Sequence, residues 1–183
     1  MRKLIAIIGM PGTGKTTLMR EWMSSRKWET DNSVKLLNSM VSGDIRLFGK
    51  YEEGDLFAGT DKLSMAVQPE AIKYLQNPTH SVNIFEGDRL TSIAFFQEAL
   101  KLGYDLSIVI LEVSDQTREK RYQERGSEQN EKFIRGRRTK IENVKSEFEE
   151  KIFTGDPCYY QTFSHETSED TQKVISYINS LIE

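Results

Sequence analysis

The chain has 183 residues, of which 37% are hydrophobic and 29% charged, and its formal net charge is −3. This size suits a single domain, residues 1–183, with a core large enough to need no disulfide or metal for stability. The lone cysteine, Cys158, excludes a disulfide within the chain and suits a reducing cytoplasm. No run approaches the ~20 apolar residues of a membrane span, and the mild acidity gives no global sign of nucleic-acid or membrane binding.

Short apolar or aromatic runs predict strands along the chain. In chain order the strand candidates are residues 4–8, 34–37, 45–48, 82–85, 108–113 and 159–163. The first is entirely aliphatic and the fifth is the most apolar, which is typical of strands buried on both faces. The candidates at 34–37 and 45–48 are weaker signals. The next stretch, residues 49–61, carries three glycines and four acids and predicts a surface loop.

Helical patterns lie between these strands. In chain order they cover residues 16–26, 69–76, 91–102, 115–125 and 131–151, with a last helix from about residue 168. Pro69 suits a first helical turn, Gly103 suits a C-cap, and Ser114 or Asp115 suits an N-cap. Strand alternating with helix predicts an α/β fold of three layers, in which a five-stranded, mainly parallel sheet carries helices on both faces.

The edge of the sheet at the carboxyl ends of these strands is the expected ligand site. Right-handed crossovers bring the carboxyl ends of parallel strands to one edge, and ligands bind along that edge in open α/β sheets. The loops expected to matter are therefore those that follow residues 8, 37, 85, 113 and 163.

The segment after the first strand carries the clearest motif. Residues 9–16 read GMPGTGKT and fit the phosphate-loop pattern G-x-x-x-x-G-K-[ST]. Glycines let backbone amides surround phosphate oxygens, and the following helix directs the positive end of its dipole towards them. Lys15 can reach the β- and γ-phosphates, and Thr16 can hold Mg²⁺. The predicted phosphate-binding residues are Gly9, Met10, Pro11, Gly12, Thr13, Gly14, Lys15, Thr16 and Thr17.

This motif, with a strand before it and a helix after it, predicts a P-loop NTPase fold that binds a nucleoside triphosphate with Mg²⁺. The guanine-reading motif N-K-x-D is absent from the sequence, so ATP is the expected nucleotide. The order of elements over most of the chain also resembles the P-loop kinases that act on nucleotides, nucleosides and polynucleotides.

The sequence EGDR directly follows the fourth strand candidate, at the same expected edge. In P-loop kinases an acid at this place holds Mg²⁺, directly or through water, or accepts the proton of the acceptor hydroxyl. Glu86 is therefore the predicted metal ligand, and Arg89 is predicted to neutralise charge on the transferred phosphoryl group. Asp88 is the first candidate for the general base. Glu86 is its rival for that role, Asp44 or Asp61 could also serve, and a solvated polar turn is the alternative interpretation.

The acids Asp44, Asp61 and Asp88 are also the predicted acidic contacts to the substrate. The stretch FAGTDKLSM around Asp61 has two interpretations. Its backbone amides could face an acceptor, or Thr60 or Asp61 could simply cap a helix.

Residues 118–140 hold nine positively and four negatively charged side chains, a net charge of +5 in a protein of −3. Such asymmetry indicates that an anion binds there. P-loop kinases carry a mobile lid at this place, and arginine suits bidentate contacts to phosphate. The predicted lid contacts are Arg121 and Arg125 to ATP, Arg125 also to the transition state, and Arg135, Arg137 and Arg138 to the substrate, with Gly126 and Gly136 as hinges. The alternative is a pair of solvated helices.

Four segments together resemble a narrower family. GMPGTGKTT, FAGTDKLSMAVQP, FEGDRL and RGSEQNEKFIRGRRTKIENV are similar to the bacteriophage 5-hydroxymethyluracil DNA kinases. The resemblance implies ATP-dependent transfer of the γ-phosphate onto the hydroxymethyl group of a modified thymine in DNA, with Mg²⁺ as cofactor, in the cytoplasm of an infected host. The target base would have to leave the stack. The aromatic residues Tyr122, Phe133, Tyr159 and Tyr160 offer faces for base stacking, although core packing explains each one equally well.

Two other functions fit the same residues. One is a kinase for a free nucleoside, a nucleotide or a polynucleotide 5′-hydroxyl. The other is an ATPase or a nucleotide-regulated binding module that has no phosphoryl acceptor. By analogy with the fold alone, residues 155–165 are expected near the adenine.

Overall fold

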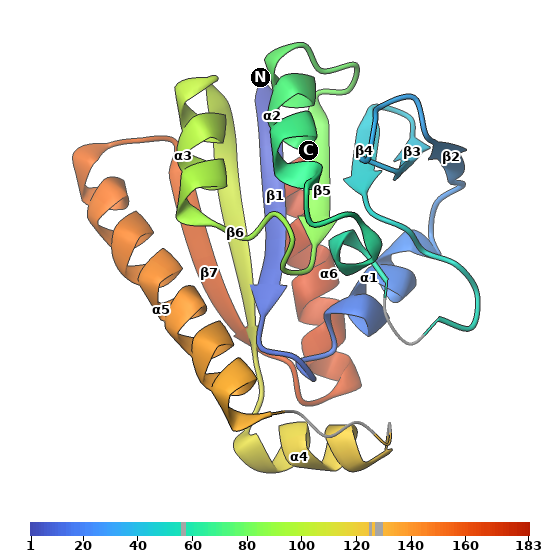
Figure 1. Ribbon diagram of the computed structural model, residues 1–183, viewed down its shortest axis with the longest axis vertical. Helices are drawn as coiled ribbons and strands as arrows, with labels where there is room; N and C mark the ends of the chain where they lie inside the picture. Colours follow the sequence, from blue (N-terminus) through green and yellow to red (C-terminus); the bar gives the residue numbers. More distant parts are fainter. Residues whose placement is uncertain (56–57, 125, 127–129) are drawn as a thin grey trace.

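The computed structural model describes residues 1–55, 58–124, 126 and 130–183, and within them one mixed sheet is covered by helices on both faces (Figure 1). The strands are β1 (Arg2–Gly9), β2 (Glu29–Asp31), β3 (Ser39–Ser42), β4 (Ile45–Phe48), β5 (Val82–Glu86), β6 (Tyr104–Glu112) and β7 (Cys158–Ser164). The helices are α1 (Lys15–Met23), α2 (Val67–Gln76), α3 (Ile93–Lys101), α4 (Asp115–Glu124), α5 (Glu131–Thr154) and α6 (Ser168–Ile182), and η1 (Thr60–Lys62) is a single 3₁₀ turn.

The strand order is β2-β3-β4-β5-β1-β6-β7. The strands from β4 to β7 in this order pair in parallel, whereas β2 and β3 add antiparallel pairs at one edge. The predicted α/β fold with a mostly parallel sheet is therefore confirmed, but its five-stranded size is wrong. Among the described residues the sheet has seven strands, because a short hairpin extends the parallel part.

The strand candidate at residues 34–37 is also wrong. Strand pairing occurs on either side of it, in β2 and β3, while Leu37 is buried in a loop and Leu36 has a positive φ of 60°. The hairpin escapes detection because β2 reads ETD and β3 reads SMVS, and neither is long or apolar enough to show a strand period. The loop that leaves the second parallel strand therefore begins after Phe48, not after Leu37.

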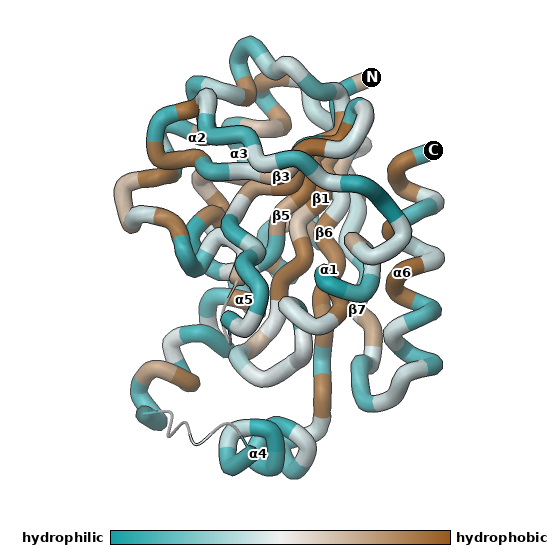
Figure 2. The backbone as a smooth tube through the Cα atoms, turned by 90° about the vertical axis from the view of Figure 1, so that its right-hand side faces the viewer, coloured by the Kyte–Doolittle hydropathy of each residue, from teal (hydrophilic) through white to brown (hydrophobic). Residues whose placement is uncertain are grey.

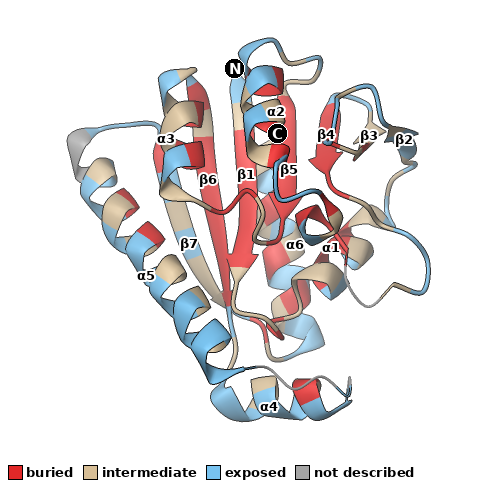
Figure 3. Ribbon diagram, in the orientation of Figure 1, coloured by how far each residue is buried: buried red, intermediate tan, exposed pale blue. Residues whose placement is uncertain are grey.

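Two cores lie on opposite faces of the sheet because successive strand residues point to opposite sides. Leu4, Ala6 and Ile8 of β1 pack with α2, α3 and α5, whereas Ile5 and Ile7 pack with α1 and α6. Figure 3 shows the buried strands between the helical layers. Burial of β1 on both faces confirms that its aliphatic run belongs to a central strand.

Helices α4 and α5 occupy the segment predicted as a lid. Figure 2 shows α4 as a mostly hydrophilic helix at one end of the molecule, and Tyr122 is its buried residue. The helix α5 is 24 residues long and contains Gly136, so this glycine lies inside a helix and not between two helices. No helix in the described part of the chain is long and apolar enough to cross a membrane.

Candidate active site

The phosphate-loop sequence connects the carboxyl end of β1 to the amino end of α1, as its motif predicts. Thr13 Oγ1 donates a hydrogen bond of 2.8 Å to the carbonyl of Met10 and thereby closes the loop. Lys15 Nζ donates to the carbonyls of Gly9 and Met10, at 3.0 and 3.1 Å, and so lies across the loop. Thr17, in contrast, is exposed on α1.

Helix α4 packs directly on this loop. Arg121 Nη1 donates to the carbonyl of Gly12 at 3.0 Å, and Tyr122 Oη donates to the carbonyl of Pro11 at 2.7 Å. Gly12 has φ +80°, and a Cβ there would lie 2.9 Å from the Tyr122 ring. Arg121 is thus next to the loop that the motif assigns to phosphate.

The residues after β7 also reach the loop. His165 is buried, and its Nδ1 donates to the carbonyl of Thr13 at 2.7 Å. Arg121 Nη2 donates to the carbonyl of His165 at 3.1 Å. The expected proximity of this end of the chain to the nucleotide site therefore rests on His165, the last residue of the predicted segment.

Glu86 ends β5, which lies beside β1 with Ile7 opposite Glu86. Its side chain accepts a 2.9 Å hydrogen bond from Thr16 Oγ1, across 70 residues of sequence. The residue is 1% exposed, and burial raises the pKa of its carboxyl group to about 7. A hydroxyl and a carboxylate facing each other beside a phosphate loop are the oxygen ligands that suit Mg²⁺. Thr16 and Glu86 therefore fit the predicted metal site.

A cavity of about 500 Å³ joins these groups. The phosphate loop lines it together with Asp61, Asp88 and Arg89. The lid contributes Tyr122, Phe133 and Arg137. A volume of this size is typical of a small-molecule site.

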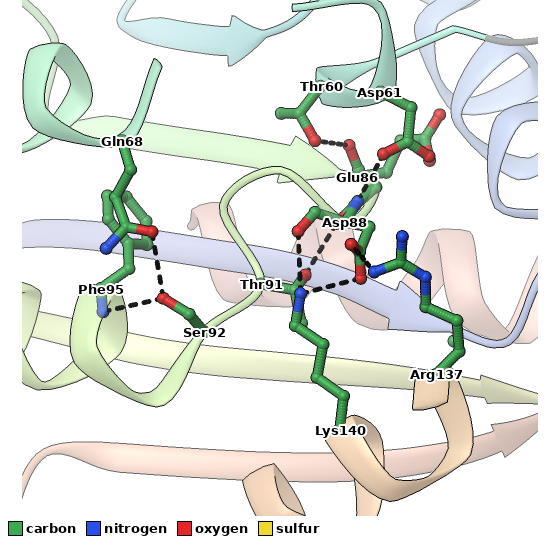
Figure 4. A network of polar contacts seen from close by, with 12 residues as sticks. Thr60, Asp61, Gln68, Glu86, Asp88, Thr91, Ser92, Phe95, Arg137 and Lys140 are labelled. Atoms are coloured by element: carbon green, nitrogen blue, oxygen red, sulfur yellow. Dashed lines mark hydrogen bonds and ion pairs between the residues drawn. The ribbon is translucent and has the colours of Figure 1, made fainter. Parts of the chain in front are cut away.

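The turn that carries both EGDR acids is held from outside by η1 (Figure 4). Thr60 Oγ1 donates to the carbonyl of Glu86 at 2.8 Å, and Asp61 Oδ1 accepts from the amide of Asp88 at 2.7 Å. Gly87 between them has φ +107°, and a Cβ there would lie 2.7 Å from Thr60 Oγ1. Ala58, Gly59 and Thr60 are buried, so the predicted surface loop ends in a packed element that fixes this turn.

Replacing Thr60 by valine is expected to lower the free energy of unfolding by about 1–3 kcal/mol, because it leaves the buried carbonyl of Glu86 without its donor. Valine has nearly the same shape, so packing is preserved. Urea unfolding measures the change, with Thr60→Ser as the matched control that keeps the hydroxyl. Equal stability of the valine and serine variants would contradict this role.

The acid Asp88 is bound by two cations of α5 (Figure 4). Arg137 Nη1 forms an ion pair with its Oδ2, and Lys140 Nζ lies 3.0 Å from its Oδ1. These two residues are three apart on one helix face, so they meet the same carboxylate. The guanidinium of Arg137 also lies 4.6 Å from the ring centroid of Phe133.

Four predicted site residues lie elsewhere or are not described. Asp44 precedes β4, at the amino ends of the strands, where its Oδ1 accepts from the amide of Ser81 at 2.9 Å. Its assignment as a base or substrate contact is therefore wrong, because the turn between antiparallel β3 and β4 lies at the edge opposite the phosphate loop. Arg135 is exposed, and Arg138 pairs with Asp115 at 3.4 Å beside a separate cavity of about 250 Å³. Arg125 lies outside the described residues.

Several contacts were not predicted from the sequence. Lys140 could have been found from its spacing to Arg137 on one helix face. Thr60 was considered only as a cap, and Tyr122 only as a stacking face. The hydrogen bond from His165 has no local sequence signal.

One comparison with known proteins, the scan against family models, agrees with this geometry. A family model described as P-loop Nucleotide Kinase3 matches residues 1–169. No curated protein matches the chain. Among solved structures, a crystal structure of an uncharacterized protein from Eubacterium ventriosum has 14% identity and a TM-score of 0.44 over 98% of this chain and 99% of the other, which is too little to indicate fold or function. With its phosphate loop, its acid-bearing neighbour strand and this family match, the chain belongs to the P-loop nucleotide kinase family.

Proposed function

We propose that this protein transfers the γ-phosphate of ATP to an alcohol hydroxyl. The observation that carries the proposal is the set of carboxylates, Asp61, Glu86 and Asp88, that line one cavity with Lys15. An acceptor that is itself a phosphate is already anionic and would be repelled by these acids. An alcohol, in contrast, must lose a proton when it is phosphorylated, and a carboxylate is a suitable general base.

In the proposed reaction the phosphate loop and Lys15 bind the β- and γ-phosphates of ATP. Mg²⁺, held by Thr16 and Glu86, would supply charge neutralisation at the phosphate oxygens. The acceptor oxygen forms a bond to the γ-phosphorus while the bond to the β-γ bridging oxygen breaks, and ADP leaves. The hydroxyl proton passes to the carboxylate of Asp88. Arg89 and Arg137 line the cavity and would offset the developing negative charge.

Asp88 is the preferred base for a geometric reason. Glu86 is buried and already accepts from Thr16, and one oxygen of Asp61 accepts the amide of Asp88. Among the described residues, the carboxylate of Asp88 forms ion pairs with Arg137 and Lys140 of α5. Movement of a lid would release it to act as a base.

Replacing Asp88 by asparagine is expected to lower kcat about 10²–10⁴-fold, since the amide cannot accept the proton. The KM for ATP should stay nearly constant. Steady-state kinetics with radiolabelled ATP measures both constants, and Asp105→Asn, on β6 outside the cavity, is the matched control. A loss of only a few-fold would move the role to Asp61 or Glu86.

For the acceptor we propose the hydroxymethyl group of 5-hydroxymethyluracil in DNA, which would place the reaction in the cytoplasm of a bacteriophage-infected cell. Two observations support this choice: the resemblance of the four sequence segments, and the positive lid, with Arg137 and Lys140 beside the acids. The alternatives are a free nucleoside or nucleotide, a polynucleotide 5′-hydroxyl, and ATP hydrolysis without an acceptor.

Mass spectrometry of nucleosides digested from DNA distinguishes these acceptors. DNA with and without 5-hydroxymethyluracil is incubated with the protein, ATP and Mg²⁺. A mass gain of one phosphoryl group on the modified nucleoside alone supports the proposal. Phosphorylation of DNA 5′-ends, or of free nucleosides in a parallel incubation, would support a different acceptor. ADP release at a rate that no acceptor changes would support an ATPase.

A further inference from the structure

The first turn of α5 presents an exposed aromatic ring at the cavity. Phe133 is 42% exposed, lines the cavity and belongs to neither hydrophobic core. Phe148, on the same helix, is fully buried. Burial of a phenylalanine side chain is worth about 1.5–3 kcal/mol, and much of this is not realised at Phe133. The position therefore calls for a reason other than core packing.

The contacts of Arg137 indicate what the exposed Phe133 ring binds. Its guanidinium lies 4.6 Å from the ring centroid of Phe133 and at the same time pairs with Asp88. Phe133, Arg137 and Ile141 follow one another at spacings of four residues and all line the cavity, so one face of α5 is directed into it. An aromatic ring and a guanidinium plane are thus offered together, next to the proposed general base.

We propose that Phe133 and Arg137 form a stacking subsite for the nucleobase of the phosphoryl acceptor. The inference rests on the proposed phosphoryl transfer and specifies the class of its acceptor. A planar base can stack on the phenylalanine ring or on the guanidinium. A base held there brings a hydroxyl group close to Asp88, because Arg137 contacts both. The lid thereby selects acceptors that carry a base, while the acids select for an alcohol.

The guanidinium of Arg137 also connects binding of the acceptor base to proton transfer at Asp88. The contact of Arg137 with Asp88 neutralises the carboxylate that must accept a proton. The face of the guanidinium is available for a base while its N–H groups pair with Asp88, so acceptor binding and the charge at Asp88 involve one side chain.

The test is Phe133→Ala with the acceptor that wild type phosphorylates, chosen from a 5-hydroxymethyluracil oligonucleotide, 5-hydroxymethyl-2′-deoxyuridine and an unmodified oligonucleotide with a 5′-hydroxyl. Loss of one stacked base is expected to raise the acceptor KM about 5–150-fold. The KM for ATP and the kcat should change less than about twofold, since the ring carries no charge and belongs to α5 and not to the phosphate loop. Phe133→Trp keeps a stacking face and should stay near wild type. Tyr159→Ala removes an aromatic ring that is 58% exposed on β7, outside the cavity, and is the matched control.

The outcomes separate this inference from the proposed function. An unchanged acceptor KM in Phe133→Ala, or a rise only in the KM for ATP, overturns the stacking subsite and leaves phosphoryl transfer standing. If wild type phosphorylates no acceptor, the proposed function fails, and fluorescence anisotropy of the labelled 5-hydroxymethyluracil oligonucleotide then decides. Binding that weakens in Phe133→Ala but not in Phe133→Trp supports the subsite, whereas equal binding by the two variants, or no binding by wild type, overturns it.

Discussion

Replacing Lys15 by alanine is expected to lower the rate of phosphoryl transfer about 10³–10⁵-fold, the range associated with loss of a cation that stabilises the transferring phosphoryl group. The ammonium group lies across the phosphate loop on the carbonyls of Gly9 and Met10. It is therefore already positioned where the triphosphate would lie. Its removal takes away charge stabilisation that Arg121 does not replace, because Arg121 is bound to the carbonyls of Gly12 and His165.

Two measurements make this prediction specific. Single-turnover transfer from labelled ATP gives the rate, and thermal unfolding shows whether the variant is folded. Lys35→Ala, at an exposed position away from the cavity, is the matched control. Turnover close to wild type in folded Lys15→Ala would remove the basis for assigning this loop to phosphate.

Replacing Glu86 by glutamine is expected to change activity and stability in opposite directions. Activity should fall at least about 10²-fold, because the amide is a poor Mg²⁺ ligand beside Thr16. Stability of the metal-free protein should rise at neutral pH. The cause is burial, which raises the pKa of Glu86 from its usual value of 4.5 to about 7 and so makes its ionised form unfavourable in the folded state.

The direction of the pH dependence follows from proton linkage. Between pH 4.5 and about 7 the folded protein binds more protons at Glu86 than the unfolded chain does. The contribution of this group to stability is therefore greatest below pH 4.5 and falls as the pH rises through this window, by about 3 kcal/mol. Urea unfolding in EDTA should show this decline in wild type and in Glu150→Gln, an exposed control, but not in Glu86→Gln. The same decline in Glu86→Gln would assign it to another group.

How far the sequence predicts the site depends on how local each signal is. The phosphate loop is readable because its eight residues are contiguous. The contact of Thr16 with Glu86 spans 70 residues, yet it follows from parallel neighbouring strands that end at one edge. The hydrogen bond from Thr60 to the carbonyl of Glu86 could not be predicted in the same way. The turn η1 has no residue periodicity, and its separation from β5 along the sequence is not fixed by any motif.

The errors also have physical causes. The short hairpin β2–β3 has no apolar pattern that predicts strands. Asp44 was therefore expected at the carboxyl edge of the sheet, although it lies at the amino edge. Among the lid arginines, helical phase separates Arg137 from Arg135 and Arg138. Only the face that also carries Phe133 and Ile141 is directed into the cavity. Counting positive charge identified the segment predicted as a lid, but not the side of it that faces the cavity.

The packing of α4 against the phosphate loop restricts which amino acids the loop can carry at one of its variable positions. The general pattern G-x-x-x-x-G-K-[ST] leaves positions 11 and 12 equally open. Because Tyr122 bonds to the main chain of Pro11, other residues are tolerated at position 11 without loss of that contact. Position 12 is different, since any side chain there would collide with the Tyr122 ring and strain a positive φ. Relatives that keep a tyrosine in α4 should therefore keep a glycine at position 12, and the two positions should change together during evolution.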